Sequence, residues 1–142
     1  MGFSMKILII GSGGREHALV WKLSQSSRVK KIYAAPGNAG IADLATCLPV
    51  AAEDFSGLLS AVRENRIDLV IVGPEAPLVA GIADLFSREK IPLFGPSREA
   101  AQLEGSKAFT KNLLKEAKIP TAAFELFSDF ESASRYLKIQ SY

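Results

Sequence analysis

A glycine cluster follows directly on the first apolar run of the chain, in the stretch Gly11-Ser12-Gly13-Gly14-Arg15-Glu16-His17. Residues 7–10, just before it, are all aliphatic, which is typical of a strand buried on both faces of a parallel sheet. Glycines let the backbone turn sharply and approach a ligand closely. A helical pattern begins at once after the cluster, and the free N–H groups of a helix start favour an anion. The stretch therefore predicts a site for an anion, usually a phosphate group.

The same cluster departs from the dinucleotide-binding fingerprint G-x-G-x-x-G. Gly11 and Gly13 match its first half, but Glu16 stands where the third glycine would fall. The fingerprint also expects a carboxylate about 20 residues further on, where it would hold a ribose 2′-hydroxyl. Residues 34–36 at that place are two alanines and a proline. These departures disfavour an NAD-dependent oxidoreductase domain, which stays an alternative, as does a tight turn whose glycines serve only packing.

The composition is that of an ordinary globular domain, with 48% apolar and 23% charged residues among 142. A formal net charge of +2 is too small to indicate a nucleic-acid partner. The single cysteine, Cys47, cannot form a disulfide within the chain, which indicates a reducing compartment. No apolar run approaches membrane-spanning length, so we expect a cytoplasmic protein without a membrane partner.

Short apolar runs alternate with helical patterns along residues 6–104. Strands are expected at residues 6–10, 31–34, 68–72 and 92–94, with a short extended piece near 48–50. Helices are expected at residues 14–25 and 55–65, in one helix through Leu78, Ile82, Leu85 and Phe86, and at 97–104. Alternation of this kind predicts an α/β fold with an open parallel sheet and right-handed crossovers.

Each of the four main predicted strands ends at a glycine, namely Gly11, Gly37, Gly73 and Gly95. In open parallel sheets, ligands bind outside the carboxyl ends of the strands. The sequence therefore predicts that the four glycine loops converge on one site at one edge of the sheet.

The character of the chain changes after Gly105. Residues 106–118 predict a helix, residues 124–127 an extended segment, and Ser128 to Glu131 a capping box that opens a last helix to about residue 137. Most of the lysines in this part are expected to lie on a solvated face. We place a domain boundary here, with one domain at residues 5–105 and a second segment at 106–142.

Several motifs stand together in order: GSGGREH at residues 11–17, APGNAG at 35–40, VGPEAPL at 72–78, FGP at 94–96 and AQLEGSKAFT at 101–110. Together they resemble the N-terminal part of the glycinamide ribonucleotide synthetase family, also called phosphoribosylamine–glycine ligase, within the ATP-grasp ligases. The resemblance implies a Rossmann-like pre-ATP-grasp domain at residues 5–105 and the start of an ATP-grasp domain from residue 106. It also implies a reaction of de novo purine synthesis, in which glycine is joined to 5-phosphoribosylamine with ATP and Mg²⁺ or Mn²⁺.

The resemblance implies roles for residues of the first glycine loop. Gly11, Gly13 and Gly14 would offer backbone N–H groups to the sugar or its phosphate. Arg15 would pair with phosphate or lie solvated, and Glu16 would contact the ligand or only complement the helix dipole. No catalytic residue and no metal ligand is implied for this stretch.

Expected roles can also be given for four further residues. Glu75 follows a Gly-Pro turn after a buried strand, where its carboxylate would accept hydrogen bonds from ribose hydroxyls. Asn38 would bind ligand or hold a left-handed turn. His17, the only histidine, is expected to be a hydrogen-bonded helix residue and not an acid or base. Lys107 matches the family lysine that reaches an ATP phosphate, and without the rest of the ATP cleft it is expected to be an exposed lysine.

The sequence ends at Tyr142, where the family would continue into the loop that covers ATP. We therefore expect a fragment of the ligase that is inactive alone and holds no cofactor. The tail carries four phenylalanines, Phe109, Phe124, Phe127 and Phe130. A tail of this length must dock on the first domain, fray, or bury its apolar face against a second copy, and we expect the last, in a homodimer. A non-catalytic sugar-phosphate-binding module is the remaining alternative.

Overall fold

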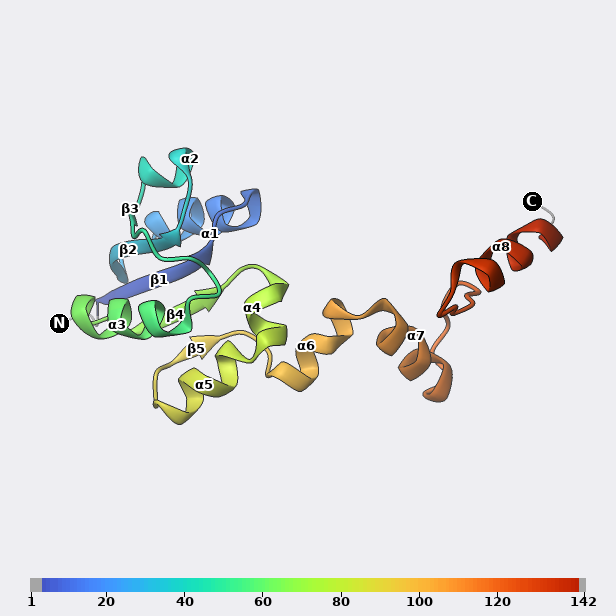
Figure 1. Ribbon diagram of the computed structural model, residues 1–142. Helices are drawn as coiled ribbons and strands as arrows, with labels where there is room; N and C mark the ends of the chain where they lie inside the picture. Colours follow the sequence, from blue (N-terminus) through green and yellow to red (C-terminus); the bar gives the residue numbers. More distant parts are fainter. Residues whose placement is uncertain (1–3, 141–142) are drawn as a thin grey trace. The chain divides into compact units, whose positions relative to one another are not determined.

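A computed structural model describes residues 4–140 of the chain, which divides into two compact units, Met1–Gly105 and Ser106–Tyr142. In the first unit five strands form one sheet: β1 (Met5–Gly11), β2 (Val29–Pro36), β3 (Thr46–Cys47), β4 (Leu69–Val72) and β5 (Leu93–Phe94). Their order in the sheet is β3-β2-β1-β4-β5, and every pair is parallel (Figure 1). The predicted α/β fold with an open parallel sheet is confirmed.

The central strand β1 is buried on both faces, as its aliphatic run predicts. Ile7 is 2% exposed and Leu8, Ile9 and Ile10 are fully buried. Successive side chains of a strand point to opposite faces. Ile7 and Ile9 therefore belong to one apolar cluster, and Leu8 and Ile10 to another.

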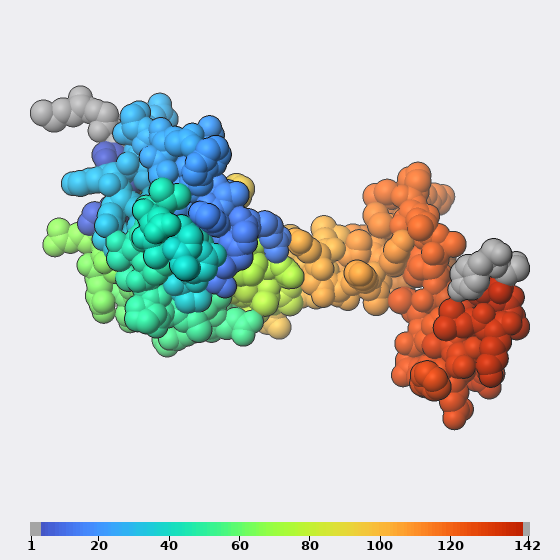
Figure 2. Space-filling model, turned by 90° about the horizontal axis from the view of Figure 1, so that it is seen from above, coloured from blue at the N-terminus to red at the C-terminus, as the bar shows by residue number. Residues whose placement is uncertain are grey.

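Helices cover both faces of the sheet. The cluster of Ile7 and Ile9 is closed by α1 (Gly14–Ser24), through Val20, and by α2 (Ala39–Ala42), through Ile41. These two helices lie side by side, blue and cyan, in Figures 1 and 2. The cluster of Leu8 and Ile10 is closed by four others, namely α3 (Phe55–Asn65), α4 (Glu75–Ala80), α5 (Ile82–Arg88) and α6 (Arg98–Gly105).

Two local predictions were wrong. The helix expected through residues 78–86 is two helices, because Gly81 between α4 and α5 has φ +99°, a conformation that glycine adopts without the steric cost of a side chain. The extended piece expected near residues 48–50 lies earlier, since β3 pairs with β2 through Thr46 and Cys47. The short helix α2 was not predicted, because its apolar content is too low for a clear periodicity.

The second unit contains α7 (Lys107–Glu116) and α8 (Phe130–Ile139). The hydroxyl of Ser106 caps α7 by accepting a hydrogen bond from the Phe109 N–H at 3.2 Å. Asp129, one residue beyond the predicted Ser128, caps α8 by accepting from the Ser132 N–H at 2.8 Å. The segment at residues 124–127 pairs with no strand in the described chain. None of the helices in residues 4–140 has the length and apolar character that a membrane span requires.

The second unit exposes many large apolar side chains, which predicts self-association of the chain. None of residues 106–140 is buried, and the exposed large apolar side chains here are Phe109, Leu113, Ile119, Leu126, Phe127, Phe130, Leu137 and Ile139. Because contiguous exposed apolar surface favours association, we expect the chain to form dimers or larger species at high concentration. Light scattering would measure the mass of the chain and of a variant ending at Gly105, which keeps both apolar clusters. Monomeric masses for both proteins at the same high concentration would contradict the prediction.

Candidate functional site

The loops that follow β1, β2 and β4 meet at one edge of the sheet. The chain leaves β1 toward β2 on one side and later returns to place β4 on the other, so the strand order reverses between β1 and β4. The Gly37 N–H donates to the Gly11 carbonyl at 3.1 Å, and the Gly73 N–H donates to the Ile10 carbonyl at 3.0 Å. In doubly wound sheets, such a reversal point is where ligands bind. The predicted convergence is confirmed for these three loops, whereas Gly95, the fourth predicted member, lines a separate cleft with Ala83 and Ser97.

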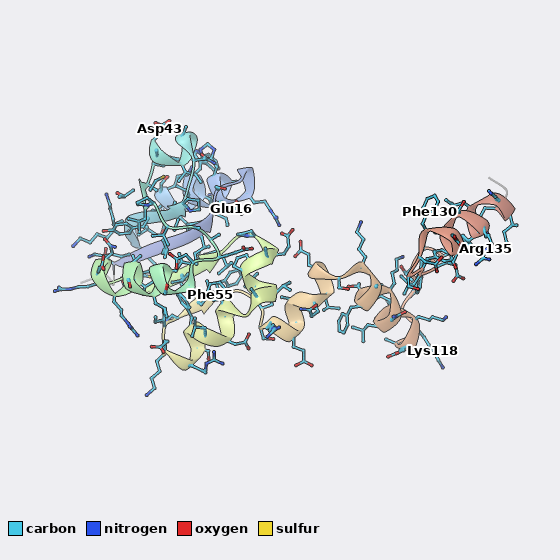
Figure 3. The ribbon with its side chains drawn as sticks, in the orientation of Figure 1. Glu16, Asp43, Phe55, Lys118, Phe130 and Arg135 are labelled. Atoms are coloured by element: carbon cyan, nitrogen blue, oxygen red, sulfur yellow. The ribbon has the colours of Figure 1, made fainter. Side chains whose placement is uncertain are left out.

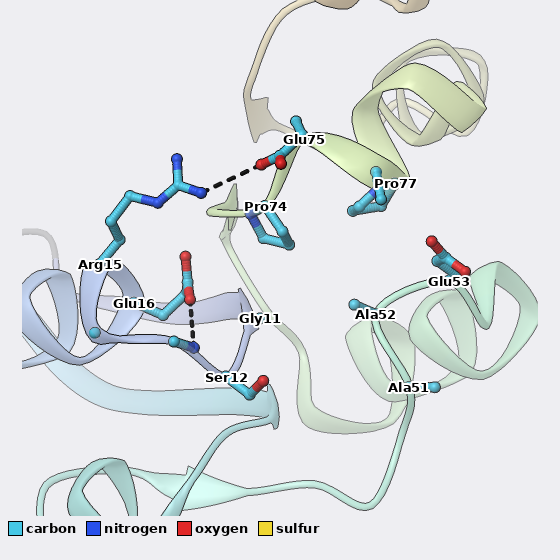
Figure 4. A pocket seen from close by; sticks show the side chains of 13 residues that line it. Gly11, Ser12, Arg15, Glu16, Ala51, Ala52, Glu53, Pro74, Glu75 and Pro77 are labelled. Atoms are coloured by element: carbon cyan, nitrogen blue, oxygen red, sulfur yellow. Dashed lines mark hydrogen bonds and ion pairs between the residues drawn. The ribbon is translucent and has the colours of Figure 1, made fainter. Parts of the chain in front are cut away.

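An open cleft of about 550 Å³ lies at this reversal point. Three segments line it: Gly11 to Glu16 after β1, residues 51–53 before α3, and Pro74 to Pro77 at the start of α4 (Figure 4). Sequence reasoning missed residues 51–53. They follow β3, whose carboxyl end lies at the same edge of the sheet, so a correct placement of β3 would have found them.

Glu16 is the one charged side chain among the described residues that is buried, at 4% exposed. It lies at the start of α1, beside the end of β1 (Figures 3 and 4). Its Oε2 accepts a hydrogen bond from the Gly13 N–H at 2.6 Å. This bond satisfies one of the backbone donors that a helix start leaves free, and it places a carboxylate at the positive end of the helix dipole.

Three glycines surround the Glu16 carboxyl group so closely that none could carry a side chain without a shift. A Cβ on Gly11 would lie 2.7 Å from Glu16 Cγ, and a Cβ on Gly13 would lie 2.8 Å from Glu16 Oε2. A Cβ on Gly73 would collide with Glu16 Oε1. Gly11 also has φ +125°, which side-chain-bearing residues rarely adopt. These glycines thus make room for the chain's own carboxylate, a role that the sequence alone did not indicate.

Arg15 links the two loops that flank the cleft. Its Nη2 donates to Glu75 Oε2 at 3.2 Å (Figure 4). Its Nη1 lies 3.8 Å from Glu104 Oε1 on α6. The side chains of Arg15 and Glu75 are 64% and 48% exposed, so the ion pair adds little to stability. Its main consequence is orientation, because it holds the Glu75 carboxylate at the rim of the cleft.

The pKa of the Glu75 carboxyl lies below its usual range. The largest cause is a hydrogen bond from the backbone N–H of Glu75 itself, which is the first residue of α4, and the Arg15 guanidinium adds to it. Both interactions favour the ionised form. Glu75 therefore presents a hydrogen-bond acceptor at neutral pH.

Asn38 and His17 serve the local structure around the cleft. Asn38 is extended, with φ −150°, so the left-handed turn belongs to Gly37 at φ +74°. The Asn38 side chain accepts from the Ile41 N–H at 2.9 Å and donates to the Ser12 carbonyl at 2.7 Å. The His17 ring lies against Gly40, where an added Cβ would be 2.9 Å from its Cε1.

The described residues add no support for a phosphate contact by Lys107, and they contain no metal site. Lys107 is exposed at the first position of α7, and the cleft is lined by residues of the first unit alone. Among residues 4–140, no group of three or more His, Cys, Asp or Glu side chains is arranged to hold a metal ion.

The close packing of Glu16 on Gly73 gives a prediction for stability. Gly73→Ala should destabilise the protein by about 1–3 kcal/mol, because the new methyl group displaces the buried carboxyl. In a Glu16→Ala background the same change should cost much less, since the colliding atoms are gone. Urea unfolding followed by circular dichroism would measure all four proteins.

Gly14→Ala is the matched control for this cycle, because a Cβ there meets no atom within 4 Å. It should leave the free energy of unfolding unchanged or slightly higher. Strictly additive costs for Glu16→Ala and Gly73→Ala would contradict the packing argument.

The ion pair at the cleft rim gives a prediction for titration. Arg15→Gln should raise the pKa of Glu75 part of the way to its usual value, because the hydrogen bond from its own N–H remains. The depressed pKa stabilises the fold above the unfolded-state pKa, and this contribution is lost as the pH falls through the folded-state pKa. Carbon-13 NMR of the Glu75 carboxyl would follow the change. Arg63→Gln, which breaks the Arg63–Glu89 pair, is the control, and equal Glu75 titration curves in all three proteins would be the contrary result.

Comparison with known proteins identifies relatives over nearly the whole chain. Residues 5–104 match the family described as phosphoribosylglycinamide synthetase, N domain. Phosphoribosylamine–glycine ligase of Agrobacterium fabrum is 54% identical over 136 residues, which are 96% of this chain and 32% of that protein. The ligase of Caldanaerobacter subterraneus is 52% identical over 134 residues, 94% of this chain and 32% of that protein. The chain thus spans about a third of the length of these curated relatives.

Solved structures agree with this relationship. The crystal structure of phosphoribosylamine–glycine ligase from Thermotoga maritima matches with a TM-score of 0.68 and 31% identity, over 96% of this chain and 31% of that one. N5-carboxyaminoimidazole ribonucleotide synthetase from the same organism matches with a TM-score of 0.67 and 21% identity, over 93% of this chain and 36% of that one, and shows a shared fold. The family match covers most of the chain, and the chain therefore belongs to the phosphoribosylglycinamide synthetase N-domain family.

Proposed function

We propose that this chain forms the phosphoribosylamine side of the active site in a phosphoribosylamine–glycine ligase. The longer protein would join glycine to 5-phosphoribosylamine and cleave ATP to ADP and phosphate. The observation that carries the proposal is the cleft at the reversal point of the sheet, where Glu75 and the Gly11-to-Glu16 loop face each other. Family membership supports the same activity and does not favour an NAD-dependent oxidoreductase.

Glu75 is the residue to which we assign contact with the sugar. A carboxylate with a lowered pKa accepts hydrogen bonds from neighbouring hydroxyl groups at neutral pH, and a ribose ring offers two such groups side by side. Arg15 positions this carboxylate across the cleft. The sugar would lie against the loop that contains Gly11, Gly13 and Gly14. Asn38 holds this loop in place, because its side-chain amide donates a hydrogen bond to the Ser12 carbonyl.

ATP and Mg²⁺ or Mn²⁺ would supply the activation of glycine in the whole ligase. We propose Lys107 as the one contact of this chain to an ATP phosphate, from the start of α7. In this proposal, residues 106–142 begin the ATP-grasp domain. A non-catalytic sugar-phosphate-binding module is the competing interpretation, and a ligase assay of the longer protein separates the two.

Glu75→Ala in a protein that contains the whole ligase tests the sugar contact. The loss of hydrogen bonds from hydroxyls to a carboxylate costs about 1.5–3 kcal/mol, or about ten- to a hundredfold in affinity. The KM for phosphoribosylamine should rise by this factor, whereas the KM for ATP should stay unchanged. Glu89→Ala is a matched control, because Glu89 also forms a surface ion pair with an arginine but does not line the cleft. Unchanged phosphoribosylamine kinetics in Glu75→Ala would rule the assignment out.

The 142 residues by themselves should not form glycinamide ribonucleotide. They correspond to about a third of the length of the relatives, and no cluster of metal ligands is present among residues 4–140. Product formation would be measured by mass spectrometry with chain purified from a host that lacks its own ligase. Turnover by that preparation would overturn this part of the proposal.

A further inference from the structure

The cleft contains more acidic than basic side chains. Among its lining residues are one guanidinium, from Arg15, and three carboxyl groups, from Glu16, Glu53 and Glu75. The guanidinium is already engaged, because its nitrogens lie 3.2 Å from a Glu75 oxygen and 3.8 Å from a Glu104 oxygen. Like charges repel a phosphate group that approaches such a surface. The cleft is therefore an unfavourable place for an anion, although its glycine loop has the form of an anion site.

Glu16 occupies the position that an anion would take in this loop. Its Oε2 binds the Gly13 N–H at 2.6 Å, and the hollow formed by Gly11, Gly13 and Gly73 is filled by its carboxyl group. A phosphate oxygen would need the same N–H and the same space. The chain's own carboxylate has therefore replaced the ligand at the helix start.

The second carboxylate oxygen of Glu16 also disfavours an anion at this place. Oε1 is buried and has no hydrogen-bond partner among the described residues. A buried carboxylate oxygen can only accept hydrogen bonds, and leaving it without a donor is costly. Because this buried oxygen already lacks a donor, a further acceptor such as phosphate beside it would raise the cost.

We propose that Glu16 determines which end of the ligand enters the cleft. The loop takes groups that donate hydrogen bonds, namely hydroxyl or ammonium groups, and it turns phosphate away. That the ligand is a phosphorylated ribosylamine rests on the proposed function. In that case the ribose hydroxyls and the amine face Glu16 and Glu75, and the phosphate points out of the cleft.

Titration of the nitrogen-15-labelled chain with inorganic phosphate tests the proposal, because the amide signals of Gly13 and Gly14 report on the loop alone. In the unmodified chain these signals should not shift at millimolar phosphate. Glu16→Gly, which restores the third glycine of the fingerprint and frees the Gly13 N–H, should bind phosphate at least about tenfold more tightly. Glu16→Gln keeps an acceptor for Gly13 but removes the charge, so its affinity should lie between the two.

Glu53→Gln is the matched control, since it removes the same charge from the cleft and leaves the Gly13 bond intact. Its loop signals should behave as in the unmodified chain. If Glu16→Gly does not fold, the phosphate affinities of Glu16→Gln and Glu53→Gln, measured at the same loop signals, test the proposal without it. Phosphate shifts at Gly13 in the unmodified chain, or equal effects of both glutamine variants, would overturn the proposal. The ligase assay of the longer protein does not depend on this titration, so failure of the Glu16 proposal can be told apart from failure of the proposed function.

Discussion

The arrangement of the cleft depends on one buried carboxylate. Glu16 reaches back from the first turn of α1 to the Gly13 N–H and fills the space beside Gly11 and Gly73. Burial of a carboxylate is costly, and the short charge-assisted hydrogen bond and the helix dipole offset part of that cost. Its carboxyl group packs against the loops after both β1 and β4, whose spacing is set by the pairing of these two strands and by the hydrogen bond from the Gly73 N–H to the Ile10 carbonyl. Arg15, the residue before Glu16, reaches from the first of these loops to Glu75 after the second.

The architecture of the first unit could be predicted from the sequence, because its signals are local and repeated. Uninterrupted aliphatic runs such as residues 7–10 identify strands buried on both faces, and glycines after them mark the carboxyl edge of the sheet. The order of strands then places the loops of Gly11 and Gly73 at the reversal point. The convergence of the site followed from topology, without any knowledge of side-chain contacts.

The roles of individual residues could not be predicted in the same way. The glycines suggested room for a ligand, whereas the room at Gly73 is taken by Glu16, which is distant in sequence. Asn38 could be assigned to a turn or to a ligand by its type alone, and only the positions of Ser12 and Ile41 show both ends of its side chain engaged. The break at Gly81 was missed because the apolar spacing continues across it, and a backbone angle leaves no trace in hydrophobic periodicity.

In the proposed function, the sugar binds in the cleft at the reversal point of the sheet. The most direct measurement is the amide NMR spectrum of the chain during titration with ribose 5-phosphate, an unreactive analogue of the amine. If the sugar binds in this cleft, the shifts should be concentrated in Gly11 to Glu16, residues 51–53 and Glu75. Shifts concentrated instead at the separate cleft that contains Arg88 and Arg98, where two guanidinium groups could attract the phosphate, would contradict it.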